Sequence, residues 1–342
     1  MNYLPVNETS LEKAAEIIRS GGLVAFPTET VYGLGADAYN PSALAKVFDV
    51  KNRPFFDPLI IHIAAVETLD TAADLVILSG EKRKILFLLI ENFWPGPLSI
   101  ILPKSSKIPG LATAGLSNAA FRFPDHPAAQ KLISLSTGAI AAPSANPFGS
   151  LSPTKAQHVK DKLGDKIDMI LDGGQTQIGL ESTVLDITSE KIKILRHGGT
   201  TKEAIEKIIG SVIDSNDKID GETSGGLASP GQLKNHYAPL TALTLFDDDG
   251  IYYVPFESDT GYLFFDDLSC NVWIKKEQER RRSKLIKVLS ASGQMQEAAS
   301  CFFETLHDLD NMGVSKIYAQ LAPHHGLGVA INDRLQRASS NI

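Results

Sequence analysis

The N-terminal part of the chain repeats one pattern that restricts the fold strongly: a short apolar run that ends in a polar turn. Leu23–Phe26 precedes PTETVYGLGADA, Ala139–Ala142 precedes PSAN, and Ile192–Leu195 precedes RHGG. Apolar runs of this length, bounded by turn residues, are typical of buried strands. Segments with helical periodicity lie between several runs, so the sequence predicts an α/β fold whose strands end in polar turns.

The turn at residues 27–38 is rich in polar side chains. Pro27 ends the preceding strand because it has no N–H to donate to a sheet. Gly33 and Gly35 permit backbone conformations, or a close approach to a ligand, that other residues do not. Open α/β sheets bind ligands at the carboxyl ends of strands, so this stretch is either a ligand-binding turn or an ordinary loop leading to a helix. Its polar side chains include Thr28, Glu29, Thr30 and Tyr32.

Helix signals accompany these strands. The capping box Thr9-x-x-Glu12 predicts a helix over residues 10–20, Asn40-Pro41 begins one over 41–50, and the box Thr200-x-x-Glu203 begins another. Two further helices are predicted, one over 81–93 that ends at WPGP and one from Ser152-Pro153 to residue 163. Additional strands are predicted at 59–63, 98–102, 121–124, 167–171 and 183–187.

A change in composition divides the chain. Residues 211–239 are rich in Gly, Ser, Asp and Asn and lack periodicity, which predicts a linker between a first domain, 1–210, and a second, 240–342. A chain of 342 residues suits two domains. The second domain reads as a smaller α/β unit, with strands near 241–246, 251–255, 261–265 and 316–320, and helices near 276–290, 294–311 and after Gly328.

Composition limits the function and the location. The net charge is −7, and residues 1–210 hold 21 Lys and Arg against 22 Asp and Glu, whereas the remainder holds 12 against 18. This balance argues against a dedicated nucleic-acid binder. Cys270 and Cys301 have no metal-ligand spacing, so no metal-binding residues are predicted. The chain shows no secretory signal and no membrane-length apolar run, so a cytoplasmic location is expected.

Cations stand close to the polar turns. Arginine offers paired donors to phosphate or carboxylate, so Arg53, Arg122 and Arg196, with Lys51, suit a ligand that carries phosphate and small polar groups. Other interpretations remain open: Lys51 and Arg53 could be solvated loop cations, and Arg122, between two phenylalanines, could simply be exposed. His62 lies in an apolar strand, where a buried structural histidine is commoner than a catalyst.

Several familiar catalytic motifs are missing from the sequence. It contains no G-x-x-x-x-G-K-[ST] and no G-x-G-x-x-G, and neither Ser144 nor Ser182 lies in a G-x-S-x-G setting. The residues alone therefore predict an α/β enzyme for a phosphate-bearing substrate, without a Walker motif, a dinucleotide motif or a nucleophilic serine.

Five motifs in order resemble those of the YrdC-like threonylcarbamoyl-AMP synthases: PTETVYGLGADA, KNRPFFDPLIIHI, WPGPLSIILP, APSANPFGSLSPT and LESTV. The segment SPGQLKNHYAP and the second domain resemble the long, two-domain form of that family. The resemblance implies a YrdC-like twisted open sheet flanked by helices, joined by a linker that folds over the active site to a smaller, Rossmann-like α/β domain. It extends over nearly the whole chain.

The resemblance also implies an activity. Members of this family are nucleotidyltransferases that make threonylcarbamoyl-AMP and diphosphate from L-threonine, bicarbonate and ATP, with Mg²⁺ on the nucleotide. The product is passed to a tRNA threonylcarbamoyl transferase complex that modifies position 37 of tRNA. At most a weak contact with tRNA, and none with a membrane, is expected.

The family's binding residues transfer to this sequence position by position. The residues implied for threonine are Thr30, His62, Arg122, Ala142 and Ser182. Those implied for ATP are Lys51, Arg53, Asp57, Asn118, Ser144, Ser152, Arg196 and Tyr237. Lys51 and Arg53 would also act catalytically on the phosphates, and Tyr237, in the linker, would cover the nucleotide.

Some positions depart from the family pattern. Asp57 stands where asparagine is usual, Asn118 replaces a common threonine, and His197 replaces a proline. A carboxylate near phosphates is unfavourable unless magnesium or Lys51 offsets it. Two rival functions remain, an RNA-binding module and a carbamoyltransferase that uses carbamoyl phosphate. The proteins that carry the latter have acylphosphatase-like and cysteine-rich segments, which two isolated cysteines cannot supply.

Overall fold

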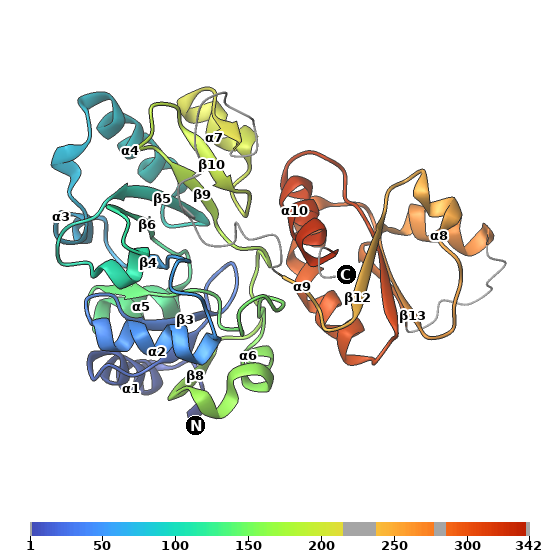
Figure 1. Ribbon diagram of the computed structural model, residues 1–342, viewed down its shortest axis with the longest axis horizontal. Helices are drawn as coiled ribbons and strands as arrows, with labels where there is room; N and C mark the ends of the chain where they lie inside the picture. Colours follow the sequence, from blue (N-terminus) through green and yellow to red (C-terminus); the bar gives the residue numbers. More distant parts are fainter. Residues whose placement is uncertain (1, 215–236, 277–284, 340–342) are drawn as a thin grey trace. The chain divides into compact units, whose positions relative to one another are not determined.

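The computed structural model describes residues 2–214, 237–276 and 285–339, and these form two compact units (Figure 1). The first unit contains residues 2–148, 153–177 and 181–214, and the second contains 149–152, 178–180 and 237–339. Most of the predicted linker, 215–236, lies outside the described residues, so its proposed closure over the active site stays a prediction. No described helix is both long enough and apolar enough to cross a membrane.

The first unit is built on a mixed sheet in the order β1-β8-β2-β3-β7-β4-β6-β5-β9-β10-β11. Parallel pairs join β1 to β8, β4 to β6 and β5 to β9, while β2–β3, β4–β7 and β5–β6 are antiparallel. The predicted α/β class is confirmed. The strands are β1 (Asn2–Pro5), β2 (Val24–Phe26), β3 (Gly33–Asp37), β4 (Ile60–Ile63), β5 (Leu98–Pro103), β6 (Asn118–Arg122), β7 (Ala139–Ala141), β8 (Met169–Asp172), β9 (Thr183–Asp186), β10 (Lys193–Arg196) and β11 (Ile213–Asp214).

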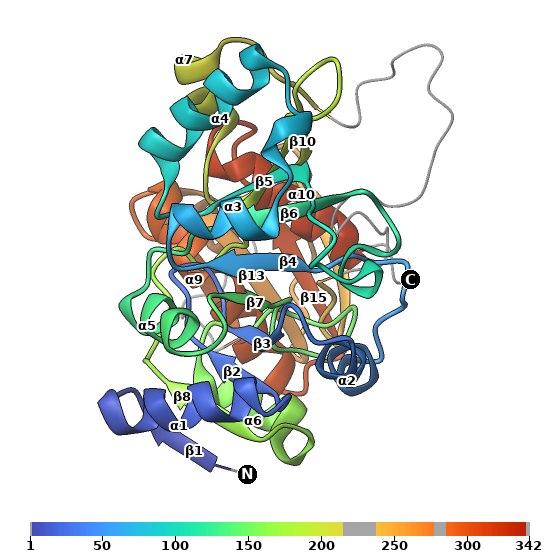
Figure 2. The ribbon, with the colours of Figure 1, turned by 90° about the vertical axis from the view of Figure 1, so that its left-hand side faces the viewer.

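Helices bury both faces of this sheet. Strand β2 shows the arrangement, because Ala25 packs with Leu44 of α2 in one apolar cluster, whereas Phe26 packs with Ala14 of α1 and Leu132 of α5 in another. Helices α1 and α5 lie side by side (Figures 1 and 2). A strand buried on both faces reads as a continuous apolar run, which is the pattern seen in the sequence. The helices are α1 (Glu8–Arg19), α2 (Pro41–Lys51), α3 (Leu69–Ala72), α4 (Gly80–Phe93), α5 (Pro127–Leu135), α6 (Ala156–Leu163) and α7 (Lys202–Ile209).

The helix starts agree with the sequence at one of the four positions where a cap or proline signal predicted them, and the helix expected from Ser152-Pro153 begins only at Ala156, as α6. Helix α2 begins as expected, since the Asn40 side chain accepts a hydrogen bond from Ser42 N at 3.0 Å and proline follows it. Helix α1 begins earlier than predicted, because Asn7 rather than Thr9 caps it in a reciprocal box with Ser10. Helix α7 is capped by Thr201, the residue after the predicted Thr200.

Strand β3 is a feature that the sequence analysis missed. Residues 33–37, assigned there to a turn, pair antiparallel with β2 and with β7. Their sequence, GLGAD, lacks the β-branched side chains that favour strands. A Cβ at Gly35 would lie 2.8 Å from the Phe26 ring and 3.0 Å from the Ile140 side chain, so the glycine is required by packing rather than by a turn. The polar turn therefore narrows to residues 27–32.

The second unit contains a parallel four-stranded sheet in the order β12-β15-β13-β14, as expected for a smaller α/β unit. Its elements are β12 (Ala242–Phe246), β13 (Thr260–Asp266), α8 (Asp267–Lys276), β14 (Ile286–Ser290), α9 (Met295–Asn311), β15 (Lys316–Gln320) and α10 (Leu327–Ser339). Two predictions were wrong. The strand expected near 251–255 is largely a 3-10 helix, η5 (Gly250–Tyr253). The helix expected over 276–290 is contradicted at its end, where residues 286–290 form β14, while residues 277–284 lie outside the described residues.

Candidate active site

Two predicted site residues are neighbours in the sheet. Strands β4 and β6 run parallel, and their register places His62 directly opposite Arg122. Strand β7 flanks β4 on its other side, and Ala142, just beyond β7, donates its N–H to the Ile60 carbonyl at 2.9 Å. The sheet thus gathers three residues predicted to bind threonine.

Arg122 is buried, so the interpretation that it is simply exposed was wrong. Its side chain is 4% exposed, and Nη2 donates to Glu29 Oε1 at 2.6 Å. Nε donates to the Gly96 carbonyl at 3.3 Å. A guanidinium held on two sides in this way is pre-oriented for a further acceptor. Glu29 was noted in the sequence only as a carboxylate in the turn, and no role was assigned to it.

His62 is uncharged in this environment. Burial, followed by the neighbouring Arg122 charge, lowers the pKa of His62 from 6.5 to about 3. Nδ1 lies 3.3 Å from the Ile60 carbonyl oxygen, so the neutral ring carries its proton there and presents Nε2 as an acceptor. The Phe26 ring meets it edge-on, with centroids 6.3 Å apart. A buried, hydrogen-bonded histidine was the commoner expectation, and it is compatible with a binding role for Nε2.

The turn before β3 contributes hydroxyl groups. Thr28 Oγ1 and Thr30 Oγ1 are 2.9 Å apart, and Thr28 also donates to the Val31 carbonyl at 2.7 Å. Thr30 is completely buried. These contacts fix the hydroxyl of Thr30 in the turn that leads into β3, and β7 alone separates β3 from the strand of His62 in the sheet.

A second set of contacts joins the start of β9 to β10. Arg196 Nη2 donates to the carbonyl of Ser182 at 2.8 Å and to its hydroxyl at 3.1 Å. Ser182 Oγ also lies 2.8 Å from Ser99 Oγ in β5. Ser99 was not predicted as a site residue, although it is the single polar residue in the strand LSIILP, a signal that could have identified it. The charge of Arg196 also contributes to the lowered pKa of His62, so these contacts lie near His62.

Lys51 ends α2 with its ammonium group buried. Nζ donates to the carbonyls of Ser144, at 2.6 Å, and of Asn146. Burial, followed by the charge of Arg53, lowers the pKa of Lys51 well below its ordinary value. Ser144 in turn forms a bridge with Gly33 of β3, which ties this lysine to the turn at 27–32. Lys51 is therefore not a solvated loop cation.

Arg53 and Asp57 form a buried ion pair, with Nη2 2.8 Å from Oδ2 and side chains 3% and 0% exposed. Arg53 also donates to the carbonyls of Asp57, at 3.0 Å, and Pro58, at 2.8 Å. Burial raises the pKa of Asp57, while Arg53, Lys51 and Arg196 oppose that rise. Three cations therefore offset this carboxylate. The interpretation of Arg53 as a solvated cation was also wrong.

The donor set limits how magnesium could be held. Within residues 2–214, 237–276 and 285–339, no three His, Cys, Asp or Glu side chains gather to form a metal site. Neither carboxylate oxygen of Asp57 accepts a well-aligned hydrogen bond from a described residue, although the Arg53 guanidinium is close to one of them. Magnesium commonly binds through one or two carboxylates together with substrate phosphates and retained waters. Asp57 fits that role, as a single protein ligand to an ion carried by a nucleotide.

The remaining predicted residues are Asn118, Ser152 and Tyr237. Asn118, at the opposite end of β6 from Arg122, donates to Thr188 Oγ1 at 3.2 Å. Ser152 and Tyr237 belong to the second unit. Tyr237 is 1% exposed, with its ring 5.9 Å from that of Phe303. Their predicted contacts with ATP remain predictions.

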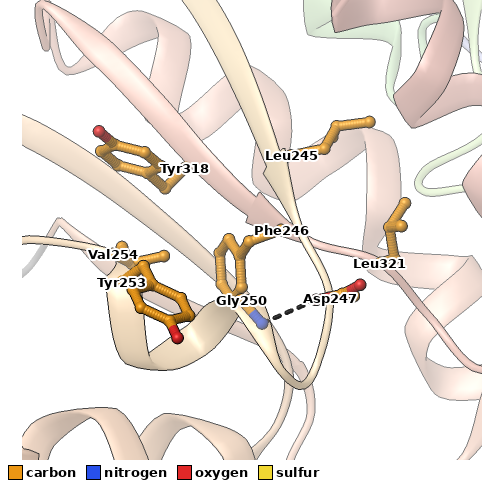
Figure 3. A pocket seen from close by; sticks show the side chains of 8 residues that line it. All are labelled: Leu245, Phe246, Asp247, Gly250, Tyr253, Val254, Tyr318 and Leu321. Atoms are coloured by element: carbon orange, nitrogen blue, oxygen red, sulfur yellow. Dashed lines mark hydrogen bonds between the residues drawn. The ribbon is translucent and has the colours of Figure 1, made fainter.

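The second unit has a cavity of its own, about 390 Å³ in volume, at the carboxyl ends of β12 and β15 (Figure 3). Its walls are mainly apolar and aromatic. The Asp247 carboxylate accepts a hydrogen bond from the N–H of Gly250 at 2.7 Å (Figure 3). No residue predicted to bind substrate lines it. The lining residues are Leu245, Phe246, Asp247, Gly250, Tyr253, Val254, Tyr318 and Leu321.

Comparison with known proteins assigns the family. The Sua5/YciO/YrdC family model, described as "Telomere recombination", matches residues 16–198, and the model "Threonylcarbamoyl-AMP synthase, C-terminal domain" matches residues 200–340. The threonylcarbamoyl-AMP synthase of Pyrococcus abyssi is 39% identical, covering 98% of this chain and 95% of its own. The Bacillus subtilis enzyme of the same name is also 39% identical, covering 98% and 94%.

A solved structure agrees with this assignment along the whole chain. The crystal structure of P. abyssi Sua5 complexed with L-threonine superposes with a TM-score of 0.84 at 37% identity, covering 99% of this chain and 96% of that one. The resemblance drawn from the five ordered motifs is confirmed. The chain belongs to the Sua5/YciO/YrdC family, in its long form with the C-terminal threonylcarbamoyl-AMP synthase domain.

Proposed function

We propose that this chain is an L-threonylcarbamoyladenylate synthase, a nucleotidyltransferase that makes threonylcarbamoyl-AMP and diphosphate from L-threonine, bicarbonate and ATP. One observation carries the proposal beyond the likeness to relatives of that name. Arg196 joins two groups of buried polar residues, through its hydrogen bonds to Ser182 and through its charge near Asp57 and His62. One group suits an amino acid, and the other suits a polyphosphate.

The amino-acid group is centred on Arg122. Its guanidinium binds the α-carboxylate of threonine, and the side-chain hydroxyl of threonine finds Nε2 of His62 and the hydroxyls of Thr30 and Ser182. Every one of these side chains is nearly or fully buried, so hydrogen bonds made there are not weakened by competing water. The Ala142 backbone completes this side of the pocket.

The residues that suit a polyphosphate are Lys51, Arg53 and Arg196, which lie around Asp57. These cations bind the phosphates of ATP, with help from Ser144, and stabilise negative charge that develops on them. Mg²⁺ held by Asp57 and the phosphates would neutralise further charge. Asn118, Ser152 and Tyr237 complete nucleotide binding in this proposal.

The chemistry needs no nucleophile from the protein. The threonine amine and bicarbonate give a carbamate and water, with a new N–C bond and loss of one bicarbonate oxygen. A carbamate oxygen then attacks the α-phosphorus, and the bond from that phosphorus to diphosphate breaks. The residues therefore act by positioning the reactants and by stabilising charge. The product would pass to a tRNA threonylcarbamoyl transferase complex in the cytoplasm.

Diphosphate release tests the proposal directly. The purified full-length chain is incubated with Mg²⁺–ATP, with and without L-threonine and bicarbonate, and the products are identified by mass spectrometry. We expect diphosphate and threonylcarbamoyl-AMP only when all three substrates are present. Diphosphate release that does not require threonine would indicate another acceptor. Steeply salt-dependent RNA binding without turnover would instead support an RNA-binding module.

A further inference from the structure

Glu29 is a buried carboxylate with one oxygen in use and one without a partner. Its side chain is 4% exposed, and Oε1 accepts a hydrogen bond from Arg122 Nη2 at 2.6 Å. Oε2 is buried and accepts no hydrogen bond from any residue that the structure describes. An unsatisfied carboxylate oxygen in such surroundings is costly, so a missing donor is expected.

The arrangement around Glu29 indicates what that donor is. Arg122 uses Nη2 for Glu29 and Nε for Gly96, and among the described residues Nη1 has no hydrogen-bond acceptor. A guanidinium nitrogen and a carboxylate oxygen of the same ion pair are therefore both available. An α-amino acid carries its carboxylate and its ammonium group on one carbon, so the two ends of this pair match the two charges of such a ligand.

The neighbouring side chains are compatible with a positive group here. His62 lies beside Arg122 in the register and is neutral, so it does not repel an ammonium ion. The Thr28 and Thr30 hydroxyls, from the same turn, add acceptors without charge.

We propose that Glu29 binds the α-ammonium group of the amino-acid substrate through Oε2 while its other oxygen holds Arg122 in place for the substrate carboxylate. This inference rests on the proposed threonine site and assigns that site its ammonium-binding residue. In the first step of the chemistry, Glu29 also serves as the proton acceptor. The ammonium nitrogen gives one proton to Glu29, the resulting amine forms the N–C bond with bicarbonate, and water leaves; Glu29 then returns the proton to solvent.

The test compares two ligands that differ only in the amine. L-Threonine and (R)-3-hydroxybutyrate share the carboxylate and the hydroxyl, but the second lacks the ammonium group. Binding of each is measured by calorimetry to the wild-type chain and to Glu29→Gln, which keeps the size of the side chain and an oxygen for Arg122. The matched control is Glu16→Gln, because Glu16 also pairs with an arginine at 2.6 Å but is exposed.

We expect Glu29→Gln to weaken threonine binding by about tenfold to a hundredfold, as for loss of a hydrogen bond between charged groups, and to leave hydroxybutyrate binding within about twofold. Glu16→Gln should change neither. Equal weakening of the binding of both ligands would show that Glu29 only positions Arg122, and would overturn the inference.

Two further outcomes keep the inference separate from the proposed function and from misfolding. If the wild-type chain binds no threonine, the proposed threonine site itself fails. If the wild-type chain binds threonine and hydroxybutyrate equally well, the proposed threonine site stands but Glu29 does not bind the ammonium group. This outcome can be observed with the wild-type chain alone. Glu29→Asp retains the charge, so it should preserve the preference for threonine; loss of the preference in a folded Glu29→Asp protein would also count against the inference.

Discussion

His62 makes the stability of the first unit depend on pH in a predictable direction. Burial and Arg122 hold the pKa of His62 at about 3, against 6.5 for an ordinary histidine. Between these values the unfolded chain binds a proton that the folded chain does not. The free energy of unfolding therefore falls as the pH drops below 6.5, and this contribution levels off near the folded pKa.

The expected size follows from the two pKa values. Each pH unit below 6.5 costs about 1.4 kcal/mol, so lowering the pH from 7 to 5 removes about 2 kcal/mol of stability through His62. Other groups also titrate in this interval, but their contributions are shared by a variant that lacks only the imidazole. In His62→Gln, the amide can still donate to the Ile60 carbonyl, but the imidazole is gone. The free energy of unfolding of this variant should therefore fall by about 2 kcal/mol less between pH 7 and pH 5.

The measurement can be confined to the first unit because its only tryptophan is Trp94, while Trp273 lies in the second. In a Trp273→Phe background, urea unfolding followed by Trp94 fluorescence at pH 7, 6 and 5 gives the free energy of unfolding of that unit. Comparing the protein that keeps His62 with the His62→Gln variant, both in this background, isolates the contribution of the imidazole. Equal pH dependence in the two proteins would show that the pKa of His62 is the same in the folded and unfolded chains, which would contradict the lowered pKa.

Three further predictions follow from other contacts. Burial and Arg53 lower the pKa of Lys51, and ATP phosphates should raise it again, so over the pH interval between the free and bound pKa values ATP binding should take up a proton. Calorimetry in buffers of different ionisation enthalpy, repeated across pH, should detect this uptake, and Lys51→Met should abolish it. A Cβ at Gly198 would lie 2.2 Å from the Glu181 carbonyl oxygen, so Gly198→Ala should destabilise the first unit by about 1–3 kcal/mol in urea and raise KM for threonine. Asn332→Leu removes two hydrogen bonds to the Ala322 backbone, both 2.8 Å, and should destabilise the second unit by about 2–5 kcal/mol without shifting unfolding monitored at Trp94.

The sequence predicted the α/β class and most strands because a strand buried on both faces keeps a continuous apolar run. It failed at β3, where packing against Phe26 requires glycine and overrides strand propensity. It also misplaced the starts of α1 and α7, since several residues near each start can serve as caps and only the backbone decides which one does. Local patterns identify elements, whereas tertiary contacts decide their limits.

The site shows a similar division. Residue types and ordered motifs indicated a cation- and hydroxyl-rich pocket, and the structure brings most of the named residues together. The pairing of Arg122 with Glu29 could not be read from the sequence, because 93 positions separate them and the contact depends on the register of β6 in the sheet. Apolar neighbours on both sides of Arg122 allowed an exposed arginine, and the sequence could not show that the face on which Arg122 lies is also buried.

The charges of the two groups of residues suit the two substrates proposed for them. In the proposed threonine site, Arg122 and Glu29 form an ion pair and His62 is neutral, so these three residues together carry no net charge, like a zwitterionic amino acid. Around Asp57, three basic side chains surround one carboxylate, which leaves an excess of positive charge suited to a polyphosphate. Burial and the charge of Arg53 lower the pKa of Lys51, and the negative charge of a bound phosphate would oppose that lowering, because it favours the protonated lysine.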